Sequence, residues 1–430
     1  MRAGAAQIDT TPPVGVKLGG FGNRYKPSEG IHDDLFARAI YLEDNETSLL
    51  LISADIVEIP NEAARQAKKA LSTKLGMDEG AILVAATHTH SGPAPNPDIT
   101  SDLESDLNDA YSQEFPSFLV EAGEKAKESS VKAFARWGTG HAEITYNRRV
   151  EGGPTDPQVI ALSFEDEAGE VFASLVNYAC HGVVLGGSNY KVSGDWMGYT
   201  ARAMEKSFGG KHVSVYTNAA TGDLNPITCR GYGCYGTFDD AQRLGLVVAT
   251  AALEGLESAS MFEIPTIGIA SSSVSVKKVI PSLESAEKLH NDQVQTLEKA
   301  RREGKDIETI RELEGVTHYT GKNLKLVRTA KFSDSEQVQL QAFRIGDLAF
   351  ATMPGEPVVK LGFELKRRSP FSPTGLVSYA NGYSGYIPMK EDYERGGYES
   401  TPTWWNRLAQ GTGEQLLEED LRLLGKLRQR

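Results

Sequence analysis

The sequence predicts a layered α/β (α+β) domain. Short apolar runs of strand length alternate with stretches of helical character, which is typical of layered folds. No repeat, low-complexity tract or linker interrupts this alternation. By length, the 430 residues allow two or three domains, but they also suffice for one large unit around a buried core. We therefore expect a single domain over residues 1–430.

The predicted strands are short apolar runs that lead into polar or turn-forming residues. In chain order they are Phe36–Leu42, Ser48–Ile56, Ala81–Ala86, Val171–Tyr178, His212–Thr217, Leu340–Ile345, Leu348–Thr352 and Leu376–Tyr379. Longer stretches predict helices over Glu62–Leu75, Gln113–Glu128, Trp196–Phe208 and Asp239–Leu256.

One segment, Pro281–Glu314, differs from the rest because it is densely charged and lacks a wide apolar face. Within it, Ser282–Gly304 and Ile307–Leu313 are expected to form two helices that break near Gly304. We interpret the segment as a solvated helical hairpin inserted at the surface. The alternatives are a lid or an oligomer contact.

Composition and charge exclude several classes of protein. The net charge of −13 disfavours a nucleic-acid partner and stable association with an anionic membrane. No apolar run approaches the roughly 20 residues that span a bilayer. The N-terminal stretch has no apolar signal core, so we expect a cytoplasmic protein, with a homo-oligomer as one possibility.

Cysteine usage gives a second indication of the compartment. The three cysteines, Cys180, Cys229 and Cys234, are too few for a disulfide scaffold. Cys229 and Cys234 are close enough in the chain to form a bridge. We expect them to be free thiols, as is usual in a reducing compartment.

Residues suited to chemistry follow five of the predicted strands. Because sites in α/β folds lie at the carboxyl ends of strands, we expect the five loops to face one another across a single cleft. The loops are Thr87–Pro93, Cys180–Gly182, Asn218–Pro226, Met353–Pro357 and Asn381–Tyr386.

Three histidines in these loops are candidate metal ligands. His88 and His90 are two residues apart, so in extended backbone both side chains lie on one face. Imidazole is the commonest nitrogen ligand for zinc. His181 follows an apolar strand and precedes a glycine. The structural alternative for all three is a hydrogen-bonded histidine in the core.

Glu356, in the sequence Pro-Gly-Glu-Pro, is the best carboxylate candidate. Its two flanking prolines restrict the local backbone and the glycine permits close approach. A turn carboxylate in solvent is the alternative. Tyrosine is a rare metal ligand, so local sequence alone favours packed aromatic roles for Tyr383 and Tyr386.

Motifs distributed over nearly the whole chain resemble the catalytic domain of the neutral (non-lysosomal) ceramidase family. That resemblance implies mixed β-sheets flanked by helices. It also implies one catalytic domain over residues 1–430, without the additional C-terminal β-sandwich of the family. The motifs are IDTTPPVGVKLGGFGNR, THTHSGP, YNR, CHG, SGD, NAATGDLNP, PGE and YANGYSGYIP followed by EDY.

The resemblance also implies a zinc amidase with one catalytic ion. Its metal ligands would be His88, His181, Glu356 and Tyr386, with Tyr383 as the second choice of tyrosine. His90 and Arg148 would lie beside the substrate and stabilise the oxyanion or hold the amide carbonyl. Asp223 would accept a hydrogen bond from a ligand and so orient it; weaker candidates for that role are Asp55 and Asp195.

Two departures from the family pattern limit what the resemblance implies. Where the family has a serine in Gly-Asp-Val-Ser-Pro, this chain has Asn225, whose amide cannot act as a nucleophile. Metal-activated water must then perform the attack, with Asn225 as a hydrogen-bonding orienter. The chain also ends near the end of the catalytic domain and shows no apolar or basic segment for docking on lipid.

These observations favour a zinc-dependent hydrolase of an amide (C–N) bond in a soluble small substrate rather than ceramide. A second hypothesis keeps the metal and replaces the amide with an ester, lactone or glycosidic linkage. A third is a metal-binding domain without catalytic activity.

Overall fold

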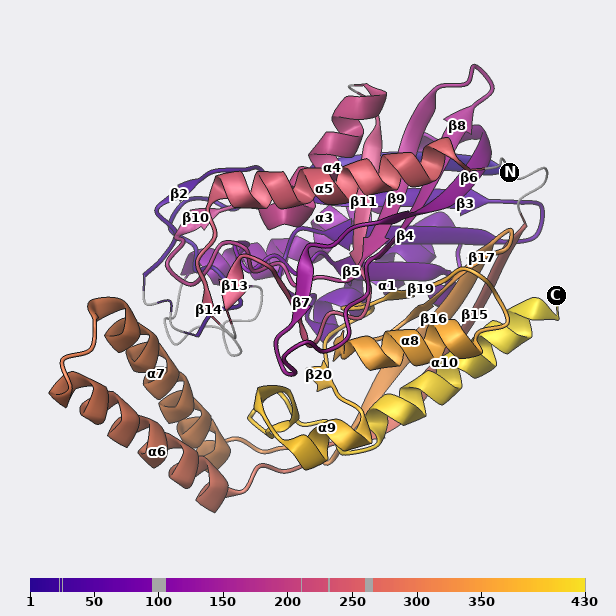
Figure 1. The fold of residues 1–430 in the computed structure, drawn as a ribbon. Coiled ribbons are helices and arrows are strands. Elements are labelled where there is room, and N and C mark those ends of the chain that lie inside the picture. Colours follow the sequence, from indigo (N-terminus) through magenta and orange to yellow (C-terminus); the bar gives the residue numbers. More distant parts are fainter. Residues whose placement is uncertain are drawn as a thin grey trace.

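The computed structural model describes residues 1–22, 24, 26–94, 106–209, 211–230, 233–259 and 266–429. Two large sheets organise this part of the chain, and helices cover their outer faces (Figure 1). The expected α/β fold with mixed sheets flanked by helices is therefore confirmed. No helix in these ranges is long and apolar enough to cross a membrane.

The first sheet is mixed and has eight strands. Only its two outermost pairs, β11–β9 and β4–β5, are parallel. In spatial order the strands are β11 (Val213–Asn218), β9 (Val171–Tyr178), β8 (Gln158–Asp166), β6 (Val131–His141), β1 (Arg2–Asp9), β3 (Phe36–Glu43), β4 (Ser48–Ala54) and β5 (Ile82–Ala86).

The second sheet has four strands, of which only β17 and β19 pair in parallel. In order they are β15 (Ile267–Lys277), β16 (Ser335–Ile345), β17 (Leu348–Thr352) and β19 (Thr374–Val377). Four short pairs complete the strands: β2 (Gly30–Ile31) with β10 (Lys191–Val192), β7 (Thr145–Asn147) with β12 (Leu224–Pro226), β13 (Cys229–Arg230) with β14 (Gly233–Cys234), and β18 (Glu356–Pro357) with β20 (Tyr386–Ile387).

Alternation of side chains along the strands places each sheet between two apolar layers. On one face of the first sheet, Leu51 and Leu175 share a core with Phe343 and Phe350 of the second sheet. The opposite face packs under α1 (Asn61–Leu75) and α3 (Asp106–Glu128) over one half. Over the other half it packs under α4 (Asp195–Phe208) and α5 (Phe238–Glu257).

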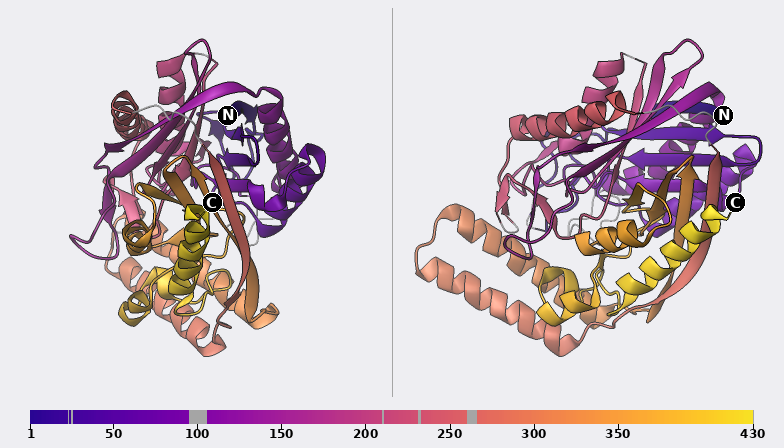
Figure 2. Two further views of the ribbon diagram at one scale, coloured as in Figure 1. Left: turned by 90° about the vertical axis from the view of Figure 1, so that its right-hand side faces the viewer. Right: turned by 45° about the vertical axis from the view of Figure 1, so that its right-hand side comes forward.

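The outer face of the second sheet packs against α8 (Val359–Arg368) and α10 (Thr412–Arg428). The layers therefore run helix, sheet, sheet, helix (Figure 2). Two short 3₁₀ segments are also present, η1 (Glu79–Ala81) before β5 and η2 (Tyr398–Ser400) after α9 (Lys390–Arg395). A helical hairpin, α6 (Leu283–Arg302) and α7 (Ile307–Thr329), extends away from the layered body (Figures 1 and 2).

The first sheet curls so that its two outermost pairs approach each other. The Ser53 hydroxyl on β4 donates to the carbonyl of Tyr216 on β11 at 2.6 Å. The amide of Asn218, at the end of β11, donates to the carbonyl of Thr87, just beyond β5, at 2.6 Å. The carboxyl ends of β5, β9 and β11 consequently meet in one place.

Most predicted elements are present with small shifts at their ends. The predicted strands Val171–Tyr178 and Leu348–Thr352 coincide with β9 and β17, and the four predicted helices correspond to α1, α3, α4 and α5. The sequence did not predict β1, β6, β8, β15, α8, α9 or α10. In β6 and β15, many residues are partly or fully exposed. Pairing with neighbouring strands therefore makes these two segments strands, and their local pattern of apolar residues does not reveal them.

Two sequence-based expectations are wrong. The second helix of the charged hairpin extends to Thr329, where Leu313 was the predicted end. Cys229 and Cys234 form a disulfide and are not free thiols. They face each other directly across the β13–β14 pair. Only that register, which the sequence does not display, brings the two sulfur atoms together.

Candidate metal centre

Three buried histidines converge where the ends of β5 and β9 meet. The ligand nitrogens of His88, His90 and His181 all lie within 4.8 Å of one another. His88 has a φ of 64°, in the left-handed region, and its amide donates to the carbonyl of Ile56. The amide of His90 donates to Gly182, the residue after His181, at 3.0 Å. Backbone bonds thus join the two histidine loops directly.

Glu356 completes the cluster from the second sheet. It lies on β18, just beyond β17, and its Oε2 is 3.0 Å from Nε2 of His181 and 3.7 Å from Nε2 of His88. Glu356 and both of these histidines are almost fully buried. The sequence-based prediction that strand-end loops deliver these residues to one place is therefore confirmed for all four side chains.

Backbone carbonyls fix the tautomers of two of the histidines. Nδ1 of His88 lies 2.6 Å from the carbonyl oxygen of Val57, and Nδ1 of His181 lies 2.7 Å from that of Thr221. A carbonyl oxygen can only accept, so both Nδ1 atoms carry the proton. Each Nε2 therefore presents a lone pair to the centre of the cluster, as a metal ligand does.

The donor atoms of the cluster lie close to one another. Nε2 of His90 is 3.0 Å from Nε2 of His88, and the carboxylate of Glu356 is equally close to His181. The lone pair on Nε2 of His181 faces the carboxylate of Glu356, and two buried acceptors this close are unfavourable unless a positive charge compensates them. The donor set, nitrogen and carboxylate oxygen, is one that zinc accepts. The residues present therefore fit a divalent metal ion.

The protonation states agree with such a site. Burial lowers the pKa of His88 to about 3 and lowers that of His90 well below its ordinary value. Burial opposes ionisation of Glu356, but His88 and His181 outweigh it and hold the pKa of this carboxyl at about 2. At neutral pH the two imidazoles are therefore neutral and the carboxyl is ionised, the forms in which these side chains bind metals.

The two candidate tyrosines have different partners. The hydroxyl of Tyr383 donates to Oε1 of Glu356 at 2.5 Å. Tyr386 pairs directly with Glu356 in the parallel β18–β20 ladder, so both side chains lie on the same face. Its hydroxyl oxygen accepts a bond from Nη2 of Arg148 at 2.9 Å. Tyr383 therefore bonds to the carboxylate of Glu356, and Tyr386 bonds to Arg148.

Arg148 connects Tyr386 to the loop that carries Asn225. Its guanidinium donates to Oδ1 of Asn225 at 3.1 Å and to the carbonyl of Gly222 at 2.8 Å. Nε of Arg148 donates to the fully buried carboxylate of Glu399 at 3.0 Å. Arg148 and Asn225 therefore lie in direct contact, and Glu399 is a partner that no sequence motif indicated.

Asp223 does not contact any predicted ligand. Its carboxylate accepts from the backbone N–H of Val359 at 2.7 Å and from the amide of Asn147 at 2.8 Å. It therefore holds the first turn of α8, whose orphan N–H groups attract a carboxylate. Asp55 and Asp195 likewise bond elsewhere, to Arg38 and to the backbone of Trp196. Backbone carbonyls orient the histidines, contrary to the expectation for these carboxylates.

One aromatic residue of the centre was not indicated by the sequence. The ring of Tyr379 stacks on His88 with centroids 3.9 Å apart and an interplanar angle of 15°. Its hydroxyl lies 2.6 Å from that of Thr221 and 3.4 Å from Oε2 of Glu356. Tyr379 ended a predicted strand, and its place in the tyrosine-rich segment Tyr379–Tyr386 was the available signal.

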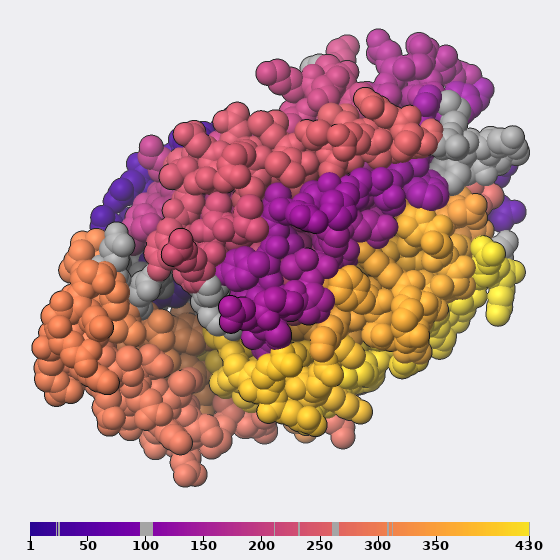
Figure 3. Space-filling model, in the orientation of Figure 1, coloured from indigo at the N-terminus to yellow at the C-terminus, as the bar shows by residue number. Residues whose placement is uncertain are grey.

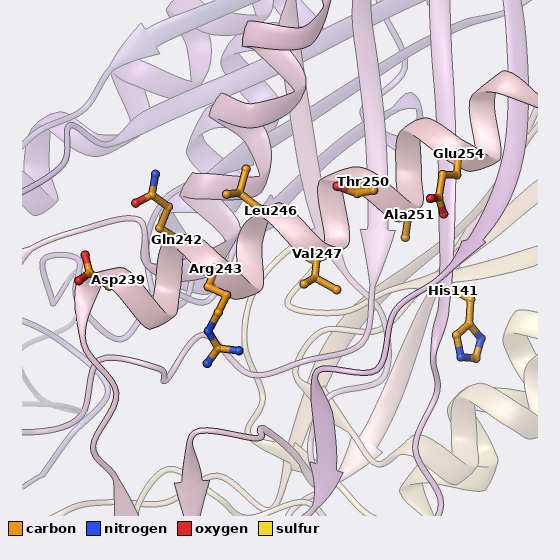
Figure 4. A pocket seen from close by; sticks show the side chains of 9 residues that line it. All are labelled: His141, Asp239, Gln242, Arg243, Leu246, Val247, Thr250, Ala251 and Glu254. Carbon is orange, nitrogen blue, oxygen red and sulfur yellow. The ribbon is translucent and has the colours of Figure 1, made fainter.

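A separate surface pocket of about 720 Å³ lies along the outer side of α5 (Figure 4). Residues of α5 and His141 line it, and it shares no residue with the histidine cluster. We therefore do not assign the chemistry to this pocket.

Fold and site together define a layered α/β protein with a buried candidate metal centre. Residues 1–102 match the family model described as neutral/alkaline non-lysosomal ceramidase, N-terminal. Neutral ceramidase B of Dictyostelium discoideum is 27% identical over 247 residues, which is 51% of this chain and 34% of that protein. The neutral ceramidase of Pseudomonas aeruginosa is 24% identical over 275 residues, covering 57% of this chain and 40% of that protein.

A crystal structure of the neutral ceramidase from Pseudomonas aeruginosa has the same fold, with a TM-score of 0.76 at 19% identity. The match covers 100% of this chain and 74% of that one. These findings confirm the resemblance that the motifs predicted: the chain is similar to the neutral ceramidases in part of its sequence and in its fold. Its sequence matches span about a third to two fifths of the length of these two curated relatives.

Proposed function

We propose that this protein is a zinc-dependent hydrolase that cleaves an amide bond in a small soluble substrate. The carrying observation is the buried cluster of His88, His90, His181 and Glu356, whose nitrogen and oxygen donor atoms converge on one point. A zinc ion in such a site acts as a Lewis acid towards a carbonyl and lowers the pKa of water. His88, His181, Glu356 and Tyr386 would hold it.

The surrounding residues support hydrolysis rather than storage of the metal. Arg148 is anchored on Glu399 and holds both the Tyr386 hydroxyl and the Asn225 amide in fixed positions. A fixed guanidinium beside a scissile carbonyl favours negative charge that develops on the oxygen. Asn225 is almost fully buried and neutral, so it orients groups and does not attack the substrate.

The relatives named as neutral ceramidases motivate the choice of an amide bond. The net charge of −13 motivates a soluble substrate, because it disfavours an anionic lipid surface. Ester, lactone and glycoside substrates remain the alternative linkages for the same metal. Ceramide itself belongs in the panel of test compounds.

The test combines metal analysis with a substrate panel of N-acyl amines, short-chain ceramide, esters, lactones and glycosides. We expect near-stoichiometric zinc and selective cleavage of amides. Absence of zinc from protein purified and reconstituted with the metal would overturn the proposal. A metal-loaded protein that cleaves esters or glycosides but no amide would overturn the bond assignment alone.

His90 provides the sharper form of this test, because it lies within ligand distance of the cluster and beside the proposed substrate position. If His90 acts on substrate, His90→Gln should keep zinc and lose about 10²-fold or more in kcat. His88→Gln, the matched control at a proposed ligand, should lose zinc. Loss of zinc from both variants would make His90 a ligand instead.

A further inference from the structure

The helical hairpin α6–α7 is inserted between two neighbouring strands. Lys277, the last residue of β15, pairs directly with Ser335, the first residue of β16. The amide of Lys278 still donates to the carbonyl of Asp334 at 2.8 Å, so both ends of the insertion leave the sheet together. In the space-filling view the hairpin forms one end of the molecule (Figure 3).

The inner side of α7 is not solvated, in contrast to the expectation for a charged surface insertion. Thr320 and Asn323 are only 2% and 1% exposed. His290 of α6 contacts the Thr320 hydroxyl at 3.1 Å, which ties the two helices together. The hairpin packs against the body through the stretch of α7 from Tyr319 to Asn323.

That stretch holds the segment 398–405, which follows α9. Oδ1 of Asn323 accepts from the backbone N–H of Trp404 at 3.1 Å. The hydroxyl of Tyr319 accepts from the indole N–H of Trp405 at 3.1 Å. Thr403 and Tyr398 also hydrogen-bond to this hydroxyl. Tyr319 therefore fixes the Trp405 ring through a specific bond.

Three residues of this segment, Tyr398, Trp404 and Trp405, form an aromatic wall together with Tyr386 of β20 beside the candidate metal centre. Ring centroids of Tyr386 lie 5.5 Å from Tyr398 and 5.8 Å from Trp405. Trp405 also stacks on Tyr383, the tyrosine that orients Glu356, at 6.0 Å. Tyr398 is 41% exposed, so this member of the wall reaches solvent.

Tyr319 also touches the loop on the other side of the histidines. A Cβ at Gly22 would come within 3.2 Å of the Tyr319 ring. The neighbouring Phe21 packs edge-on against His90, with centroids 5.0 Å apart. A residue of the inserted hairpin thus lies between the Phe21 loop beside His90 and the wall beside Tyr386.

We propose that the hairpin is the specificity element of this site, with Tyr319 as the residue that positions the aromatic wall to receive a flat, ring-bearing group of the substrate. The inference rests on the proposed function and adds the substrate class. Aromatic faces that are held rigid gain stacking interactions with a planar ring that an open-chain group does not make. The metal centre itself does not require the hairpin, since none of its proposed ligands lies on α6 or α7.

Two hydroxamates distinguish binding to the metal from stacking on the aromatic wall. Both bind zinc by the same group, and only one of them carries a ring. The probes are acetohydroxamate and benzohydroxamate, titrated calorimetrically into the zinc-loaded full chain. We expect benzohydroxamate to bind about tenfold more tightly than acetohydroxamate. The affinity ratio is the Kd of acetohydroxamate divided by the Kd of benzohydroxamate. The Tyr319→Phe substitution should reduce this ratio severalfold and leave zinc content and the Kd of acetohydroxamate unchanged.

The matched control is Tyr393→Phe, which also removes a tyrosine hydroxyl. The hydroxyl of Tyr393 donates to the backbone carbonyl of Leu408 at 2.8 Å. The Tyr393→Phe variant should preserve the wild-type ratio. A second variant replaces residues 281–331 with a short Gly-Ser linker, which the adjacent ends of β15 and β16 permit. Once thermal unfolding shows that it folds, its ratio should approach one.

The outcomes test the specificity role of the hairpin separately from the proposed metal-dependent function. A ratio that is the same in the wild type, Tyr319→Phe and the folded excision variant would overturn the inference and leave the metal centre in place. A ratio near one in the wild type itself would overturn it equally. A wild-type protein that binds neither zinc nor either hydroxamate would overturn the proposed function and the inference together.

Discussion

The histidines of the candidate centre show how single residues are prepared for metal binding by the backbone around them. Nδ1–H of His88 and of His181 each donates a hydrogen bond to a carbonyl oxygen, that of Val57 and that of Thr221 respectively. These carbonyls belong to loops next to the ends of β4 and β11, so the fold itself selects the tautomer. The predicted carboxylate, Asp223, bonds to α8 instead. Side-chain motifs cannot reveal an orienting group that belongs to the backbone.

Asp420 shows at residue scale how burial changes the ionisation of a side chain. It lies outside the candidate metal centre. It lies on α10, is fully buried, and has no hydrogen-bond partner for either carboxylate oxygen among the described residues. Burial raises its pKa well above the ordinary value. An unpaired buried carboxyl is favoured in its neutral form, because ionisation would place an uncompensated charge in the core.

The Asp420→Asn substitution should therefore remove a pH-dependent penalty. Because the folded pKa is raised, the folded chain retains a proton that the unfolded chain loses above about pH 4. Relative to the variant, wild-type stability should then fall as pH rises from about 4 through the folded pKa, by up to about 1.4 kcal/mol per pH unit. Urea unfolding of both proteins at pH 5 and pH 8 measures this.

The control for this prediction is Asp347→Asn, at an exposed position in the turn between β16 and β17. Its stability relative to the wild type should be the same at both pH values. Equal pH dependence of the wild type and Asp420→Asn would mean that the buried carboxyl is charged in the fold.

Among the elements, the small β13–β14 pair is the one that a covalent bond holds. Its two strands have two residues each and are joined by the Cys229–Cys234 disulfide. Both cysteines pack in one cluster with Val183, Phe21 and Tyr146. Phe21 contacts His90 and Tyr146 pairs with Asn225 across the β7–β12 ladder. The element therefore supports two loops of the candidate centre.

Replacing both cysteines with serine should cost about 2 kcal/mol of unfolding free energy, the chain-entropy value for so short a loop. Denaturant unfolding of the double variant, compared with the wild type with and without reductant, provides the measurement. The reduced wild type should match the variant. Thiol titration of the denatured, non-reduced wild type should find one free thiol, Cys180; three free thiols would contradict the bond.

At the scale of the whole molecule, the candidate centre lies where the two sheets meet. His88 and His181 come from the ends of β5 and β9 in the first sheet, and Glu356 follows β17 of the second. A ligand bound by these residues contacts parts of the chain that unfolding separates. Binding there should therefore stabilise the entire fold.

Zinc should accordingly raise the unfolding temperature of the apo protein in a concentration-dependent manner. At a free zinc concentration about 100 times the Kd, the free energy of unfolding should rise by about 2.7 kcal/mol. Calorimetry with zinc and with chelator checks this. The stabilisation should be much smaller in Glu356→Gln and unchanged in Glu391→Gln, which removes only an exposed ion pair with Lys360. Equal zinc stabilisation in both variants would place the metal elsewhere.

Much of this arrangement could be predicted from the sequence by itself, because its signals are local. Apolar runs located β9 and β17, and the residues that follow β5, β9 and β17 supplied His88, His181 and Glu356. Tyr386 was favoured over Tyr383 only through the family motif. Local sequence cannot show that Tyr383 is bonded to the carboxylate while Tyr386 faces Arg148.

The remainder depends on contacts between residues far apart in the chain, and only the tertiary structure decided it. Strands such as β6 and β15 are recognisable only from their neighbours in the sheets. Glu399 binds Arg148 across 251 positions, and Tyr319 holds Trp405 across 86. Composition and periodicity report which residues are apolar and where turns fall. They do not report which residues from distant parts of the chain lie opposite each other, because packing and strand register determine those contacts.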